Sequence, residues 1–219
     1  MCAVAAATVL TACSSPSKTD KQSYAVNKKI TSLRVDNYAG SIEVVAATGD
    51  TVKVVEEYDY SDGRPQTEHS VTGGQLLLKS SGCGSDADKC AVRYHVEVPA
   101  TTAAHLTLGG GDITVHGLSG ATYAKSEGGS VDIGDSSAKS VTAANGGGDV
   151  SVSFKSVPDK VDASTEGGDA TVHLPQGTYA VDATTEGGHR SVDVKTDSGS
   201  AHKVRAHTEG GDVNVESTG

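Results

Sequence analysis

The sequence predicts an all-β fold of the β-solenoid or β-helix type, a stack of two-strand coils of about twenty residues each. The first observation is a repeated double glycine, at Gly110-Gly111, Gly128-Gly129, Gly147-Gly148, Gly167-Gly168, Gly187-Gly188 and Gly210-Gly211. Successive pairs are 18, 19, 20, 20 and 23 residues apart. The second observation is an apolar period of two, while no period of 3.6 occurs, so we expect almost no helix.

The composition narrows the possible cores and partners. The 219 residues include one Phe, one Met and no Trp, which excludes a core built on large aromatic side chains. A thin core of Val, Ile, Ala and Thr remains possible, because a solenoid also relies on backbone ladders between coils. The net charge of −10 disfavours nucleic acid as a partner, since phosphate binding needs a basic patch.

The N-terminus predicts an envelope protein. Residues 1–12 are apolar and small, lack the alternation of a buried strand and are too short to span a bilayer, so we interpret them as a lipoprotein signal peptide. Leu10-Thr11-Ala12-Cys13 resembles the bacterial lipobox, which makes Cys13 the predicted site of lipid attachment. No Lys or Arg precedes the apolar stretch, so we expect the signal peptide to start further upstream. Residues 13–27 are then the lipidated Cys and a flexible polar tether.

The remaining cysteines predict a disulfide. Cys2 would leave with the signal peptide and Cys13 would be acylated, which leaves Cys83 and Cys90 flanking a short polar loop. Outside the cytoplasm such a pair is typical of a disulfide. The alternative is a metal site, but two cysteines at this spacing without a nearby His pair form a poor zinc signature.

Residues 28–217 are expected to form one adhesin-like β-solenoid domain. Its first part, residues 28–100, has alternating segments of uneven length, the last of which runs from Val92 to Val98 and ends before Pro99. Its second part, residues 101–217, contains regular coils with one short strand after each glycine pair and one before the next. We expect the glycines because the corner needs positive φ and close backbone contact between coils.

The residues beside the glycines predict a stacked polar column. We place before the glycines Glu127, Asn145, Glu166, Glu186 and Glu209, and after them Asp112, Ser130, Asp149, Asp169, His189 and Asp212. Neighbouring coils lie about 4.8 Å apart, so carboxylates in register must face water or hold cations. We predict a solvated edge, no metal site and no cofactor, with calcium along this edge as the alternative.

The sequence predicts no enzyme. It contains no nucleophile elbow, zincin motif or phosphate-binding loop, and Gly109-Gly110-Gly111-Asp112 lacks the Lys of such a loop. Each coil repeats similar residues, whereas the β-helices that cleave polysaccharides need a few carboxylates and a cation in one groove.

Two segments together resemble a known family. The similarity lies in the strand Val92–Pro99, the Gly-Gly-Asp-Ile-Thr-Val coils that follow it, and Ala183–Gly188. In these segments the chain is similar to a bacterial family of β-strand-repeat proteins described as candidate adhesins. The resemblance covers about residues 28–217. It implies a solenoid-like all-β fold on an envelope protein and transfers no catalytic residue.

These observations predict a non-catalytic, lipid-anchored protein on the extracytoplasmic face of the cell membrane. We expect it to present a binding surface, as an adhesin or envelope scaffold, to an envelope protein or a glycan. One alternative is an accessory lipoprotein in envelope-stress sensing or signalling, and the least favoured is a glycan-active β-helix enzyme.

Overall fold

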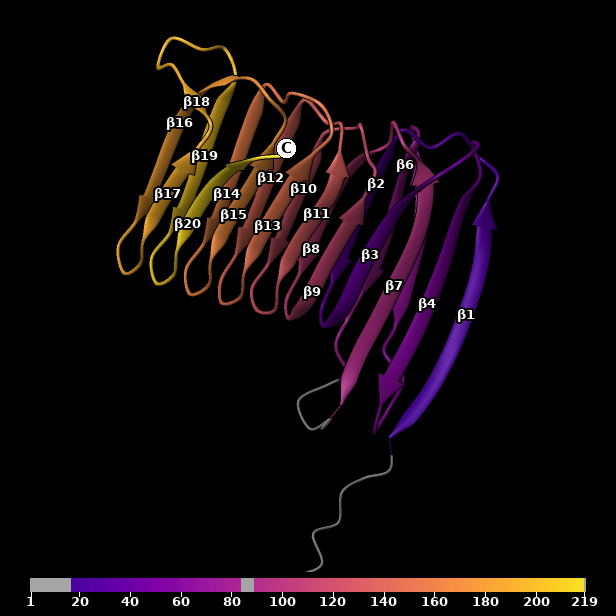
Figure 1. Cartoon of the computed structure of the whole chain (residues 1–219). Coiled ribbons are helices and arrows are strands. Elements are labelled where there is room, and N and C mark those ends of the chain that lie inside the picture. Colours follow the sequence, from indigo (N-terminus) through magenta and orange to yellow (C-terminus); the bar gives the residue numbers. More distant parts are fainter. Residues whose placement is uncertain (1–16, 84–88, 219) are drawn as a thin grey trace, which may run out of the picture.

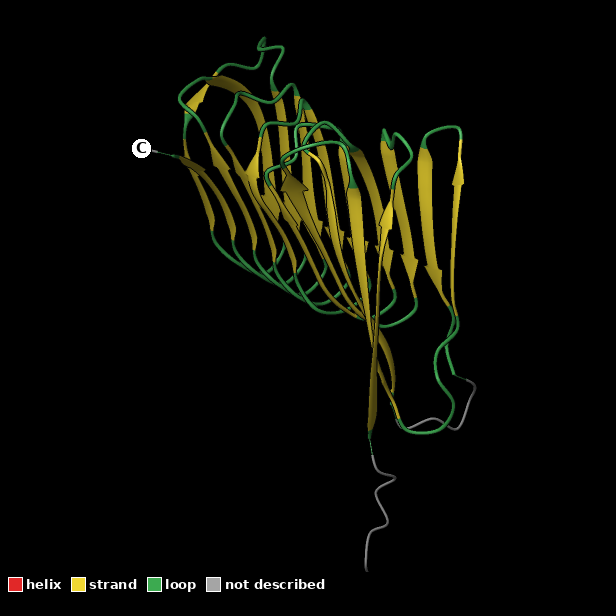
Figure 2. Ribbon diagram, turned by 90° about the vertical axis from the view of Figure 1, so that its right-hand side faces the viewer, coloured by secondary structure: helices red, strands yellow, loops and turns green. Residues whose placement is uncertain are grey.

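Two ten-stranded sheets face each other along the whole length of the molecule (Figure 1). The structure is a computed structural model that describes residues 17–83 and 89–218, and within these ranges all regular structure is β-strand. The all-β solenoid-like prediction is therefore confirmed. Figure 2 shows the coils end-on, with the two sheets joined by short turns at the lower corners.

The first sheet contains, in spatial order, β1 (Lys18–Val26), β4 (Val52–Tyr60), β7 (Cys90–Pro99), β3 (Gly40–Ala47), β9 (Gly111–His116), β11 (Val131–Ser136), β13 (Val150–Phe154), β15 (Ala170–Leu174), β20 (Val213–Ser217) and β17 (Arg190–Asp193). The second sheet contains β18 (Lys195–Thr196), β16 (Thr178–Thr185), β19 (Lys203–Thr208), β14 (Lys160–Thr165), β12 (Ser140–Asn145), β10 (Thr122–Ser126), β8 (Ala103–Leu108), β2 (Ser32–Asn37), β6 (Gln75–Ser80) and β5 (Thr67–Thr72). Most neighbours are parallel, because each coil gives one strand to each sheet before the chain moves on.

The coils at both ends of the stack depart from chain order. The last coil, β19 with β20, lies between the coil of β14 and β15 and the coil of β16 and β17. In the same way the first coil, β2 with β3, lies between the strands β6 and β7 and the strands β8 and β9. Each terminal coil therefore has a hydrogen-bonded neighbour on both sides.

The N-terminal end corrects the tether prediction. We expected residues 13–27 to be flexible, but β1 pairs antiparallel with β4 over nine residues. The unpaired edge of β4 offers backbone partners to this segment, and Lys21 reinforces the pairing through a 2.7 Å ion pair with Glu57. Any tether thus ends before Lys18. Cys13 lies outside the described residues.

A thin aliphatic core fills the space between the sheets. Inward positions alternate with outward ones along each strand, as in β13, where Val150, Val152 and Phe154 are buried. The regular coils bury mainly Val, Ile and Ala, with a few larger side chains such as Leu106 and Phe154. The fully buried tyrosines Tyr58, Tyr94 and Tyr179 lie in or beside the terminal coils.

The second glycine of each pair is required by close backbone contact. A Cβ on Gly148 would lie 2.0 Å from the carbonyl oxygen of Gly129 in the neighbouring coil, and the same clash recurs at Gly168 and Gly211. The first glycine has more room, since a Cβ on Gly147 would meet no atom within 4 Å, and one on Gly167 would lie 3.1 Å from the nearest backbone oxygen. Positive φ explains only some corners, such as Gly129 at 101°. Contact between coils is therefore the general reason for the repeat.

We expect Gly148→Ala to destabilise the protein and Gly147→Ala to leave it nearly unchanged. Forcing a methyl group against a neighbouring backbone costs about 1–3 kcal/mol, whereas a substitution into open space changes the free energy of unfolding by roughly 0.5 kcal/mol or less. Urea unfolding of both variants measures the difference. Equal losses of stability would contradict the contact argument.

Candidate binding surface

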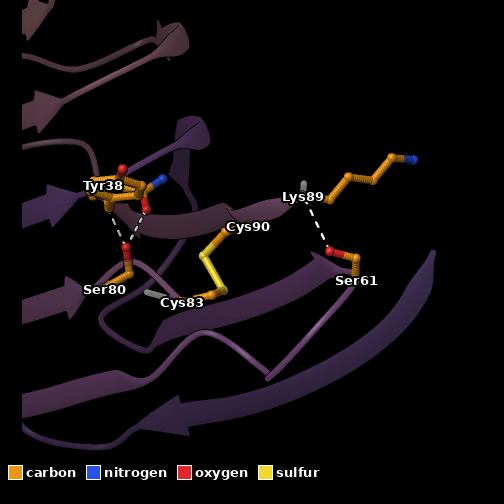
Figure 3. Close-up of a disulfide and its surroundings, with 7 residues drawn as sticks. Tyr38, Ser61, Ser80, Cys83, Lys89 and Cys90 are labelled. Atoms are coloured by element: carbon orange, nitrogen blue, oxygen red, sulfur yellow. Dashed lines mark hydrogen bonds between the residues drawn. A yellow bond between two sulfur atoms is a disulfide. The ribbon is translucent and has the colours of Figure 1, made fainter. Parts of the chain in front are cut away.

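The predicted disulfide is present. Cys83 and Cys90 are bonded, with their Cα atoms 5.7 Å apart, and they tie the segment after β6 to the first residue of β7 (Figure 3). Hydrogen bonds hold both sides of this bridge, since the Tyr38 amide donates to Ser80 Oγ at 3.0 Å and the Lys89 amide donates to Ser61 Oγ at 3.3 Å. The disulfide therefore links the segment after β6, a strand of the second sheet, to β7 of the first sheet.

The residues after the glycines form a ladder of hydrogen bonds on the outside of the corner. Each Asp accepts the backbone N–H of the residue at the same position in the next coil. The distances are 2.8 Å from Ser130 N to Asp112 Oδ1, 2.9 Å from Asp169 N to Asp149 Oδ1, 2.7 Å from Asp212 N to Asp169 Oδ1 and 2.7 Å from His189 N to Asp212 Oδ1. The carboxylates thus satisfy exposed backbone donors, and this outer ladder runs in the spatial order of the coils rather than in chain order.

A second ladder lies on the inner side of the same corner. Its members are buried and sit in register at the strand ends, as Ser126, Asn145 and Thr165 do. Ser126 Oγ donates to Gly111 O at 2.8 Å and Thr165 Oγ1 donates to Gly148 O at 2.6 Å. Asn145 was predicted to stand in the outer column with Glu127. That prediction is wrong, because Gly146 occupies that place and the Asn145 amide donates inward to Gly129 O.

The outer face of the first sheet carries short polar side chains over the regular coils. One row crosses six neighbouring strands in register and consists of Thr114, Asp132, Ser151, Thr171, Asn214 and Ser191. Neighbouring members are separated by one strand spacing of about 4.8 Å. This face is therefore a regular hydrogen-bonding surface with little charge and no large apolar group.

The outer face of the second sheet is chemically more varied. The corresponding row consists of Leu77, Arg34, His105, Tyr123, Thr142, Asp162, Arg205 and Asp182. His105 and Tyr123 stack with ring centroids 4.5 Å apart and planes 10° from parallel. Arg34 pairs with Asp36 at 2.9 Å, and this bond to Arg34 helps to hold the pKa of that carboxyl below its usual value, against the opposing effect of burial. The outer face of the second sheet is therefore better suited to recognise a specific partner than the more uniform outer face of the first sheet.

A buried polar cluster stabilises the N-terminal end. Glu56 is 1% exposed and accepts hydrogen bonds from the hydroxyls of Tyr24, at 2.7 Å, of Tyr58, and of Thr67, at 2.8 Å. Burial, and then the bond to Glu56, raises the pKa of Tyr24 and of Tyr58, so both phenols stay protonated as donors. The cluster joins β1, β4 and β5, and its carboxylate is too enclosed to meet a substrate.

The described ranges show no cluster of side chains of the metal-binding type. Among those residues no three His, Cys, Asp or Glu side chains converge as metal ligands would. In the part of the chain that the structure covers, no helix is long and apolar enough to cross a membrane. The outer faces of the two sheets offer hydrogen-bonding and charged groups in register.

A match to a protein family covers most of the chain. Residues 26–216 match the family described as Toastrack DUF4097. The chain belongs to the Toastrack DUF4097 family. This match spans the whole irregular part, residues 28–100, and the regular coils up to residue 216. Among curated proteins, no sequence matches the chain significantly.

Solved structures similar to this Toastrack protein include two bacterial proteins. A candidate cell adhesion protein from Clostridium sporogenes is 13% identical, with 92% of this chain and 100% of that chain covered and a TM-score of 0.48. A candidate adhesin from Bacteroides fragilis is also 13% identical, with 92% of this chain and 97% of that chain covered and a TM-score of 0.49.

Sequence reasoning missed one cluster of the Toastrack surface, formed by Lys160, Lys203 and Arg205. Stacking in chain order would place Lys160 beside Ala180, but the inserted last coil places Lys203 between them. Lys203 and Arg205 follow Lys160 in the chain by 43 residues or more, so no local sequence motif predicts that the three cations lie together. Only the order of the coils brings them together.

We expect the double variant Cys83→Ala/Cys90→Ala to unfold more easily than the wild type. Closing a loop of this length stabilises a protein by about 2–3 kcal/mol, because the bridge restricts the unfolded chain. Chemical unfolding of the oxidised protein and of the variant measures the loss. Thiol labelling of the non-reduced protein is the control, and free thiols at both positions would contradict the disulfide.

Acid should weaken the outer ladder at Asp212. The backbone N–H of His189 is the main cause that lowers the pKa of Asp212 in the folded protein. The ionised Asp212 carboxylate contributes its full stabilisation at pH values above the ordinary Asp pKa of about 3.9. This stabilisation is lost as the pH falls through the lower pKa that Asp212 has in the folded protein. Unfolding of wild type and Asp212→Asn from pH 6 to 2 should show a difference that shrinks in this window.

Asp132→Asn is the matched control for this titration, since Asp132 is an exposed carboxylate outside the ladder. Its acid profile should follow that of the wild type. A difference between wild type and Asp212→Asn that stays constant over the same pH range would contradict the role of the carboxylate charge.

Proposed function

We propose that this chain is a non-catalytic binding scaffold of the adhesin type, anchored by a lipid on Cys13 to the extracytoplasmic face of the cell membrane. The observation that carries the proposal is the order of the outer faces, where polar side chains stand in register across six or more strands. Such a face suits repeated, shallow contacts with an extended partner.

The arrangement of the coils supports a role in presenting a binding surface outside the membrane. The first described strand, β1, forms one end of the first sheet, and β17 forms the opposite end (Figure 1). Nine strand spacings of about 4.8 Å separate these ends by roughly 45 Å. A chain anchored upstream of β1 would hold its last coils away from the membrane surface.

Two chemical features support an extracytoplasmic address. Leu10-Thr11-Ala12-Cys13 has the residues of a lipobox, and the Cys83–Cys90 disulfide is a bond that persists in oxidising compartments. The surface also has the polar character of an exposed protein, because Tyr38 is the only large hydrophobic side chain exposed among the described residues.

Membrane fractionation of wild type and Cys13→Ala tests the anchor. We expect the wild type in the membrane fraction with a diacylglyceryl group on Cys13, and the variant released, because acyl chains supply most of the membrane affinity. Both are expressed from the complete precursor, and intact mass spectrometry identifies the modification.

The double variant Cys83→Ala/Cys90→Ala is the matched control, since it also replaces cysteines but should remain at the membrane. Protease added to intact cells should degrade the wild type if it faces outward. Wild type found in the soluble fraction with an unmodified N-terminus would overturn the proposal.

A further inference from the structure

The last three coils build a groove on the outer face of the second sheet. Its floor is formed by β14, β19 and β16, and Thr196 and Ser198 from the segment around β18 line one side. The groove has a volume of about 640 Å³, which lies within the range of about 300–1,000 Å³ typical of small-ligand sites. It is thus large enough for a ligand of two or three rings.

The groove concentrates positive charge on an acidic protein. Lys160, Lys203 and Arg205 line it, while the chain as a whole has a net charge of −10. All three side chains are exposed, and none takes part in the ion pairs found in residues 17–83 and 89–218. Asp162 and Asp182 also line the groove, on either side of Arg205, so the positive charge that remains available to a ligand is mainly that of Lys160 and Lys203.

Lys160 and Lys203 are directly opposite each other on neighbouring strands. The residues that flank this pair in the same row are Ser140 and Ala180, neither of which is charged. Like charges in register on adjacent strands repel each other and destabilise the sheet. An anion bound between the two ammonium groups would relieve this repulsion.

The next row of the groove provides both donors and acceptors. Arg205 stands in register between Asp162 and Asp182. An ionised carboxylate only accepts hydrogen bonds, so these two residues can accept them from the hydroxyl groups of a ligand, and the Arg205 guanidinium can donate to its oxygens. A ligand that fits both rows carries one anionic group and several hydroxyls on the same ring.

We propose that this groove binds a uronic acid unit of an acidic oligosaccharide, with the carboxylate between Lys160 and Lys203 and the hydroxyls at Asp162, Arg205 and Asp182. The inference rests on the proposed function and names the ligand class of its binding surface. A protein partner fits less well, because protein interfaces are commonly anchored by aromatic side chains, and none lines the groove.

Titration of the purified full chain with trigalacturonate tests the site. We expect saturable binding that weakens with added salt and falls about ten-fold or more in Lys160→Gln/Lys203→Gln, because the charge-assisted hydrogen bonds are lost. Lys79→Gln/Lys125→Gln removes the same charge from the same face, outside the groove, and should bind like the wild type. Thermal unfolding of both variants confirms that they fold.

Four outcomes would overturn the proposal. They are absence of binding at millimolar trigalacturonate, equal affinity for neutral maltotriose, unchanged affinity in the groove variant, and stronger binding of polyglycerol phosphate or of an acidic peptide. The titration uses purified protein and does not depend on the anchor. A soluble wild type in the fractionation experiment would therefore refute the membrane location and leave the binding result unaffected. Failure to bind trigalacturonate would likewise leave the membrane location unaffected.

Discussion

Backbone contact between coils at the glycine corner is the constraint on which the rest of the structure depends. At Gly148 the neighbouring carbonyl oxygen approaches within 2.0 Å of where a Cβ would lie, so the chain can turn there only without a side chain. This close approach brings successive strands into ladder distance and sets the register of both sheets. The inward alternation of Val, Ile and Ala and the outward rows of polar groups follow from that register.

Two sets of side-chain hydrogen bonds complete the corner where the backbone ladders stop. On the outside, Asp149 and Asp169 accept backbone N–H groups of the next coil, and on the inside Thr165 donates to a glycine carbonyl. Turns leave such backbone groups without sheet partners, and unsatisfied groups in a narrow corner are costly. The acidic edge is therefore part of the stacking mechanism.

The insertion of the last coil between two earlier strands per sheet affects both the stability of the stack and the formation of the groove. Because β19 and β20 have neighbours on both sides, the last coil is protected from fraying, and the edges of the two sheets at this end are β17 and the short β18. The same insertion places Lys203 beside Lys160 and Arg205 between two aspartates, which creates the groove. At the other end, β1 and the Glu56 cluster close the stack near the proposed anchor.

The sequence by itself determined the all-β coil, its period near twenty residues, the double-glycine corner and the Cys83–Cys90 bridge, because each depends on local spacing and on residue type. Only the tertiary structure decided the order of the coils, the strand formed by Lys18–Val26, the inward place of Asn145 and the partners of the corner carboxylates. All coils have similar apolar alternation, so one can replace another in the stack at little cost, and no local pattern distinguishes the neighbours. The groove depends on that choice of neighbours, which is why the sequence shows its residues but not the site.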